Sequence, residues 1–260
     1  MPQISRRDML VGGGATVIAT SFGACVPQQP IGASIGQVAA TPNLPPPEAE
    51  ELVDQQPNTP LPAERRAVAT AAYGPVPGER FPVPAAPLSR INPAFLRARV
   101  AYARGEKPGT IVIDPGAHYL YFVEEGGRAM RYGVGVGKEG FAWSGTAVIH
   151  DKQEWPDWYP PKEMIQRRPD LRGQLTELQS GIGVPGGPSN PLGARAMYLW
   201  QGNKDTLYRI HGTNEPWTVG TSVSSGCIRM INQDAIDLYA RTATGTNVIV
   251  LTPRAPARVG

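Results

Sequence analysis

Short apolar runs, separated by Gly, Pro and Asp, constrain the fold of this chain more than any other feature. They begin after residue 109, and the 260 residues include 30 Gly and 28 Pro. Gly and Pro interrupt long helices, whereas short alternating runs between turn residues are typical of strands. The sequence therefore predicts a mostly β domain. Seven runs are the candidates for its five or six strands: 110–113, 118–124, 129–135, 145–149, 196–200, 206–210 and 247–251.

Two segments carry helical patterns instead. Residues 232–241 predict a helix with Asn232 as its N-cap, because their apolar side chains fall near one face. Residues 93–104 predict another helix, in which Asn92 is the cap before a proline at the first helical position. Between the strands lies a long Pro- and Gly-rich loop, 155–192, of the kind that forms a lid or a binding loop.

The first 24 residues are expected to be an export signal. Arg6 and Arg7 precede the uncharged stretch 9–24, in a pattern that resembles the twin-arginine signal. That stretch is shorter than the roughly 20 residues that span a bilayer. Cys25 follows it, and either lipidation of this cysteine or cleavage nearby fits the sequence. Membrane contact is therefore expected only through the signal or a lipid.

Residues 25–95 are expected to be a Pro-rich disordered linker. The stretch 26–95 holds 15 of the 28 prolines and almost no periodic apolar pattern. Such a composition buries too little apolar surface to offset the entropy of ordering the chain. The expected organisation is thus a signal, a linker, a catalytic domain over 96–252 and a tail over 253–260.

Charge and composition exclude several classes of protein. The net charge is +3, and no basic run is interleaved with aromatic residues, so nucleic-acid binding is not expected. His118 and His150 lie in or beside candidate strands without the spacing of a metal site, and structural roles are expected for both. Neither a metal nor another cofactor is predicted.

His211 and Cys227 are the candidates for catalysis. His211 stands at a strand end, and Cys227 follows 16 positions later, ahead of the predicted helix. A thiol with a pKa of about 8.5 is mostly protonated at neutral pH, so a nucleophilic cysteine usually needs a histidine partner. The turn 224–227 places backbone N–H groups around Gly226, as an oxyanion site requires. The alternative interpretation of Cys227 is a small buried apolar residue.

Two motifs carry a resemblance to a known family. Ile-His-Gly-Thr at 210–213 and Ser-Ser-Gly-Cys-Ile-Arg-Met at 224–230 resemble the signature of the L,D-transpeptidase catalytic domain, also called YkuD-type. The resemblance covers about residues 109–252, and segments 136–138, 155–161 and 188–199 are similar as well. It implies a β-sandwich or barrel-like domain with one short helix after the catalytic cysteine.

The resemblance also implies a chemistry. In this family the residue matching Cys227 attacks a peptidoglycan tetrapeptide stem, releases the terminal D-alanine and leaves a thioester that an amine resolves. His211 matches the base, and the backbone carbonyl of Gly212 matches the group that orients its ring. The N–H groups of Ser225, Gly226 and Cys227 match the oxyanion donors. The family commonly has a second histidine where this chain has Ser225, which leaves His211 as the base.

Four further residues are predicted to face the substrate. Arg229 matches the position that contacts a substrate carboxylate, and Ser224, Tyr198 and Trp155 lie in the segments that resemble substrate-facing parts of the family. For Trp155 the alternative is simple packing. Glu215 lies in a loop beside a proline, so nothing aims it at His211 as a third catalytic group.

Two rival functions remain open on the sequence. A sortase-like cysteine transpeptidase would share His, Cys and Arg in a β-rich fold, and a non-catalytic wall-binding module would keep Cys227 buried and unreactive. The acceptor is open too. The expected partners are peptidoglycan stem peptides, with an outer-membrane protein or lipoprotein as a further acceptor and water as the third. The expected location is the periplasm.

Overall fold

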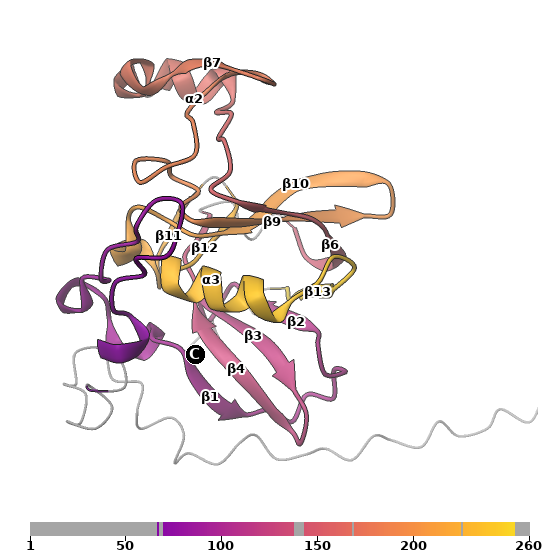
Figure 1. Cartoon of the computed structure of the whole chain (residues 1–260). Coiled ribbons are helices and arrows are strands. Elements are labelled where there is room, and N and C mark those ends of the chain that lie inside the picture. Colours follow the sequence, from indigo (N-terminus) through magenta and orange to yellow (C-terminus); the bar gives the residue numbers. More distant parts are fainter. Residues whose placement is uncertain (1–66, 68–69, 138–142, 168, 225, 253–260) are drawn as a thin grey trace, which may run out of the picture. The chain divides into compact units, whose positions relative to one another are not determined.

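A computed structural model describes residues 67, 70–137, 143–167, 169–224 and 226–252 (Figure 1). The expected signal 1–24, Cys25, most of the expected linker and the tail 253–260 lie outside these residues. No helix in the described part is long and apolar enough to span a membrane. The elements, with η for 3₁₀ helices, are η3 (Leu88–Arg90), η4 (Pro93–Phe95), β1 (Ala98–Ala101), β2 (Ile111–Asp114), β3 (Tyr119–Glu124), β4 (Arg128–Gly133), β5 (Val136–Gly137), β6 (Gly145–Glu154), α2 (Lys162–Arg167), η5 (Pro169–Gln174), β7 (Thr176–Leu178), β8 (Gly181–Gly183), β9 (Arg195–Gln201), β10 (Lys204–His211), η6 (Pro216–Thr218), β11 (Ser222–Ser224), β12 (Ile228–Arg229), α3 (Asn232–Arg241) and β13 (Asn247–Val250).

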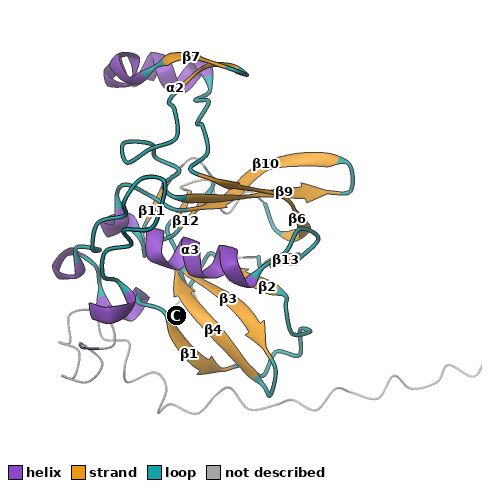
Figure 2. Cartoon of the chain, in the orientation of Figure 1, coloured by secondary structure: helices purple, strands orange, loops and turns teal. Residues whose placement is uncertain are grey.

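Strands dominate, which confirms the mostly β prediction (Figure 2). Nine of them form one sheet in the order β1-β4-β3-β2-β13-β6-β9-β10-β12. Most neighbours are antiparallel, but β13 pairs in parallel with β2, and β10 pairs in parallel with β12. Each of the seven predicted runs overlaps a strand of this sheet. The predicted helix 232–241 is α3.

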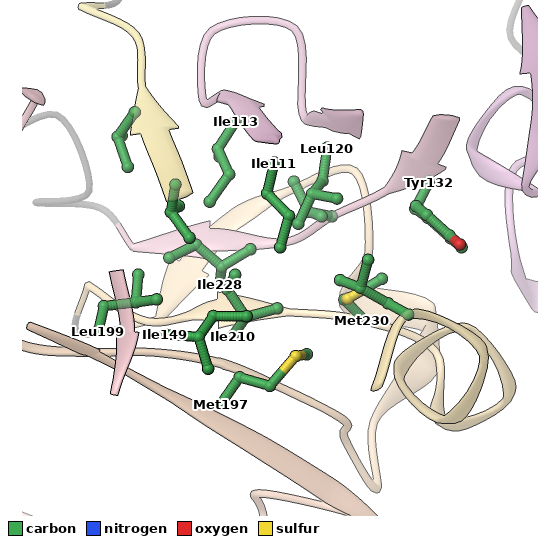
Figure 3. Close-up of a cluster of buried hydrophobic side chains, with 14 of the residues drawn as sticks. Ile111, Ile113, Leu120, Tyr132, Ile149, Met197, Leu199, Ile210, Ile228 and Met230 are labelled. Atoms are coloured by element: carbon green, nitrogen blue, oxygen red, sulfur yellow. The ribbon is translucent and has the colours of Figure 1, made fainter. Parts of the chain in front are cut away.

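The core joins side chains from distant strands of the sheet. Ile111 from β2, Met197 from β9 and Ile228 from β12 belong to one buried cluster (Figure 3). A flat sheet would hold these strands far apart, so the sheet must curve round on itself and enclose a sandwich-like core. Ala235 and Leu238 of α3 are fully buried in the same cluster. Burial of each large apolar side chain contributes about 1.5–3 kcal/mol, so α3 is fastened to the sheet by its apolar face.

The predicted helix over 93–104 is wrong beyond its first turn. The side chain of Asn92 does accept a hydrogen bond from the N–H of Ala94 at 3.0 Å, but the helix η4 ends at Phe95. The chain then becomes β1, where Ala98 pairs with Arg131 of β4. Pairing with a strand distant in sequence overrides the local helical pattern here.

The expectation of a linker is wrong for residues 70–95. The segment belongs to what is here called the N-terminal strap (70–97), in which Tyr73 and Val83 are each 2% exposed. The hydroxyl of Tyr73 donates to Asp234 of α3 at 3.0 Å and accepts from the N–H of Arg97 at 2.6 Å. Figure 1 shows the strap, in indigo and purple, beside the beginning of α3. Its composition builds no core of its own, but the segment buries its few apolar residues on the domain.

A buried ion pair also anchors the strap. Glu79 accepts hydrogen bonds from both terminal nitrogens of the Arg195 guanidinium, at 2.6 and 2.7 Å. The indole Nε1–H of Trp155 donates to the same carboxylate at 3.0 Å. The Arg195 and Glu79 side chains are 7% and 11% exposed, so removing one leaves the other charge buried without its partner.

Candidate active site

Two neighbouring parallel strands supply the candidate nucleophile and base. β10 ends at His211, and β12 begins immediately after Cys227. In their register, Ile210 pairs with Ile228 and His211 with Arg229. Ile210 and Ile228 are buried in the core. Because successive side chains along a strand point to opposite faces, Cys227 and His211 both belong to the face turned away from that core.

The imidazole of His211 is fixed in one tautomer. Its Nδ1 lies 2.5 Å from the carbonyl oxygen of Gly212. A carbonyl oxygen accepts but never donates, so Nδ1 carries the proton and Nε2 keeps its lone pair. Burial lowers the pKa of His211 to about 4, despite the opposing effect of the Gly212 carbonyl. The ring is therefore neutral at neutral pH and has one nitrogen able to take a proton.

Gly212 is itself held in place from two sides. Its N–H donates to the carbonyl of Arg195 at 2.9 Å. A Cβ on Gly212 would lie 2.1 Å from Oδ1 of Asn232, which is a severe overlap. That Oδ1 accepts the N–H of Ala194 at 3.0 Å. Asn232 is thus not the predicted N-cap of α3, since the helix begins at Asn232 and follows Ile231 without a side-chain cap.

The thiol of Cys227 is half-buried beside the backbone of β10. Its Sγ lies 3.9 Å from the carbonyl oxygen of Leu207 and is positioned to donate to it. Burial raises the pKa of Cys227, and a hydrogen bond from the backbone N–H of Arg209 partly offsets this. The sequence argument expected His211 to favour the thiolate. The resting geometry favours a neutral thiol and a neutral imidazole.

The turn before Cys227 requires glycine. Gly226 is buried and has a φ of +125°, where residues with a Cβ are strained. A Cβ there would also lie 3.0 Å from Cε1 of Tyr208. Of the three predicted oxyanion donors, Gly226 and Cys227 are described, whereas Ser225 lies outside the described residues. The backbone of Ser224 forms the end of β11, paired with β5.

Arg229 lies in β12 on the same face as Cys227, because it too flanks the buried Ile228. One of its terminal nitrogens is 3.5 Å from a carboxylate oxygen of Glu215, whose side chain is 50% exposed. An exposed pair of this kind contributes at most about 1 kcal/mol. Arg229 can therefore exchange Glu215 for another partner at little cost.

The other two predicted substrate contacts differ from each other. Tyr198 of β9 is half-buried, lies under the guanidinium of Arg209 at 4.4 Å and donates to Gln153 at 3.0 Å. Trp155 is only 4% exposed and packs edge-on against Phe81 of the strap, with ring centroids 5.2 Å apart. The strap covers the ring of Trp155, which matches the alternative of packing, and its substrate contact stays a prediction.

The remaining histidines make contacts within the fold. Nε2 of His118 lies 3.0 Å from the hydroxyl of Ser222, and burial lowers the pKa of this histidine. His150 stacks on Trp200 with ring centroids 4.0 Å apart. In the described part of the chain, no group of three or more His, Cys, Asp or Glu side chains is arranged to hold a metal ion.

Sequence reasoning missed three residues of β10 that lie next to Cys227. Asp205, Leu207 and Arg209 belong to an irregular stretch of that strand, and Leu207 has a φ of +63°. The apolar alternation that predicts a strand does not reveal a bulge within it. No signal in the sequence singles these residues out.

Known proteins identify the family of this chain. Residues 108–250, more than half of the chain, match the family model of the L,D-transpeptidase catalytic domain, YkuD. The "Probable L,D-transpeptidase ErfK/SrfK" of Escherichia coli is 31% identical over 148 residues, which are 54% of this chain and 43% of that protein. The "Probable L,D-transpeptidase YbiS" of Escherichia coli is 32% identical over 143 residues, 53% of this chain and 43% of that protein. The chain thus spans less than half the length of these relatives.

A solved structure from Brucella melitensis, described as a probable carnitine operon oxidoreductase, is 55% identical. The match covers 62% of this chain and 96% of that one, with a TM-score of 0.42. That description concerns the Brucella protein. Because residues 108–250 match the family model, this chain belongs to the YkuD family of L,D-transpeptidase catalytic domains.

Proposed function

We propose that this protein is an exported L,D-transpeptidase that acts on peptidoglycan through a thioester at Cys227. One observation carries the proposal most directly. A neutral His211, oriented by the Gly212 carbonyl, lies on the strand next to Cys227 in a member of this family. Histidine with one nitrogen held by a hydrogen bond and the other left with its lone pair is the usual base for a nucleophilic cysteine.

In the first step, proton transfer and bond formation occur together. As Sγ of Cys227 attacks the stem carbonyl carbon, its proton moves to Nε2 of His211, and the carbonyl π electrons move to oxygen. The tetrahedral intermediate then collapses and expels the amine of D-alanine, which takes the proton back from His211. Because the resting pair is neutral, the proton transfer accompanies the attack rather than preceding it.

The turn before the nucleophile would stabilise the oxyanion. The backbone N–H groups of Ser225, Gly226 and Cys227 are the proposed donors, and the conformation of Gly226 supports this role. Loss of one such donor typically costs about 3 kcal/mol of transition-state stabilisation. Arg229 would exchange its exposed pairing with Glu215 for a carboxylate of the stem.

An amine then attacks the thioester carbonyl and gives a proton to Nε2 of His211, the C–S bond breaks, and His211 passes that proton to sulfur. The proposed acceptor is an amine of a second stem peptide or of an envelope protein, in the periplasm. Tyr198 lies on the same face of the sheet as Cys227, which suits a contact with either peptide.

The experiment incubates the full chain with a purified disaccharide-tetrapeptide and, separately, with a carbapenem, whose strained lactam acylates thiols. Intact mass follows the adduct, and an amino-acid assay follows D-alanine. Cys227→Ala and His211→Ala test the pair, while Cys25→Ala and His150→Ala are matched controls elsewhere in the chain. We expect adducts and D-alanine release that vanish in Cys227→Ala and persist in both controls.

The products separate the acceptors and the rival functions. A cross-linked dimer indicates a stem amine, a tripeptide indicates water, and a protein conjugate indicates an envelope protein. If no adduct forms and Cys227 resists thiol reagents in the folded state, a non-catalytic binding module replaces this proposal. A sortase-like activity would cleave a protein signal and leave the tetrapeptide intact.

A further inference from the structure

β10 contains a bulge opposite β9, directly beside Cys227. Asp205 pairs with Trp200, and the next pairing joins Arg209 to Tyr198, so β10 advances four residues while β9 advances two. In the middle of the bulge Leu207 adopts a φ of +63°, and its side chain is 75% exposed. A leucine in the left-handed region is strained and gains little from an exposed position, so other contacts must hold it there.

Asp205 supplies those contacts. Its Oδ1 accepts the N–H of Leu207 at 2.8 Å. Its two oxygens also accept one hydrogen bond each from the two terminal nitrogens of Arg209, both at 2.8 Å. A planar guanidinium matched to a carboxylate in this way fixes orientation as well as distance. Burial opposes ionisation of Asp205, yet its bonds to Arg209 and Leu207 hold its pKa below the ordinary value.

The bulge places two backbone groups of opposite polarity at the sulfur of Cys227. The carbonyl oxygen of Leu207 lies 3.9 Å from Sγ, and the backbone N–H of Arg209 is hydrogen-bonded to the same thiol. Tyr208, between these two residues, packs against Gly226, where a Cβ would lie 3.0 Å from its ring. A regular strand would turn the Leu207 carbonyl elsewhere. The position of Sγ therefore depends on the bulge.

We propose that Asp205 is a positioning residue for the nucleophile: it holds Leu207 in a left-handed conformation and so aims the Leu207 carbonyl and the Arg209 N–H at Sγ of Cys227. The inference rests on the proposed function only in naming Cys227 the nucleophile. Asp205 does not touch the substrate in this proposal, and it acts through the backbone of β10.

The test uses the full chain carrying Cys25→Ala, so that Cys227 is its only thiol. Iodoacetamide alkylation across a range of pH reports the thiol pKa, and acylation by a carbapenem reports alignment with His211. The variants are Asp205→Ala, Asp205→Asn, and Asp205→Ala combined with Leu207→Gly. Asp151→Ala is the matched control, because Asp151 is an exposed carboxylate on β6, the strand on the other side of β9, and bonds to Lys152 and Gln153.

In Asp205→Ala we expect the two readouts to move in opposite directions. The thiol pKa should fall, because the Asp205 charge and the aimed Leu207 carbonyl both disfavour the thiolate, and alkylation at neutral pH should be faster than in the parent chain. Acylation should slow by up to about 10²-fold, as for a reacting group misplaced by roughly 1 Å. Leu207→Gly should restore acylation in the Asp205→Ala background, since glycine adopts the left-handed conformation without support, whereas the thiol pKa should recover only in part because the Asp205 charge stays absent. Asp205→Asn, which keeps an oxygen for the Leu207 N–H, should fall between.

Rescue by glycine separates positioning from a loss of folding, because glycine does not replace the ion pair with Arg209. The proposal is overturned if Asp205→Ala behaves like Asp151→Ala in both assays, or if Leu207→Gly restores neither. If the parent chain forms no acyl-enzyme but its alkylation profile shifts with Asp205 as described, the transpeptidase assignment fails and the positioning of Sγ stands.

Discussion

Glu79→Ala should destabilise the whole domain, although Glu79 lies outside the stretch that matches the family. In the folded chain this carboxylate binds both terminal nitrogens of Arg195 and the indole of Trp155. Its removal leaves a guanidinium that is 7% exposed without its main partner. Breaking a buried pair in this way costs about 3–5 kcal/mol, and the free energy of unfolding should fall by about 3 kcal/mol because Glu79 keeps some exposure.

Glu154 provides the matched control for this prediction. It lies 3.8 Å from the same guanidinium, but its side chain is 61% exposed, so Glu154→Ala should cost at most about 1 kcal/mol. Glu79→Gln should be intermediate, since an amide oxygen still accepts from Trp155. Urea denaturation of the full chain, followed by tryptophan fluorescence, measures all three variants. If Glu79→Ala and Glu154→Ala differ by less than about 1 kcal/mol, the strap is not part of the cooperative fold and the reasoning is refuted.

Three further predictions test the site and its support. Gly212→Ala brings a Cβ to 2.1 Å from Oδ1 of Asn232 and should reduce D-alanine release by about 10²-fold, with partial recovery when Asn232→Ala is added. His211→Gln should reduce the loss of unfolding free energy at acid pH. With a pKa of about 4 in the folded chain against 6.5 in the unfolded chain, His211 costs the native protein up to about 3 kcal/mol as the pH falls from 6.5 to 4. Urea titrations at several pH values measure this, and an unchanged pH dependence in the variant would contradict it. Tyr73→Phe removes the hydroxyl that donates to the buried Asp234 and should cost about 1–3 kcal/mol in thermal unfolding, whereas a neutral effect would mean that solvent replaces it.

The sequence predicted those parts of the fold that local pattern controls. Seven apolar runs and the helix 232–241 correspond to strands and to α3, because alternation and helical periodicity are local properties. The strap escaped prediction for a physical reason. Val83 and Tyr73 are buried only because other segments cover them, and a Pro-rich composition gives no sign of such partners. The same holds for β1, which is a strand because β4 pairs with it.

At the candidate site, motif and geometry contributed different things. The motif named His211 and Cys227, and the structure puts His211 at the end of β10, with the Gly212 carbonyl at Nδ1, and Cys227 immediately before the paired strand β12. The roles of these residues stay predictions until the variants are measured. The packing of Trp155 could not be predicted, because its indole partner, Glu79, lies in a segment without a recognisable motif. The bulge at Leu207 depends on side-chain bonding that apolar patterning does not encode.

The parallel pairing of β10 with the two-residue strand β12 determines which face of the sheet Cys227 occupies. β12 is the last strand of the large sheet, and Arg229 is also bridged to Gly135 through two backbone hydrogen bonds, at 2.8 and 2.9 Å. A slip of one residue would turn Ile228 outward and Cys227 inward, exchanging the apolar side chain for the thiol. Only the correct register buries Ile228, so core packing selects that register. The register that buries Ile228 in the core also places Sγ of Cys227 on the outer face of the sheet.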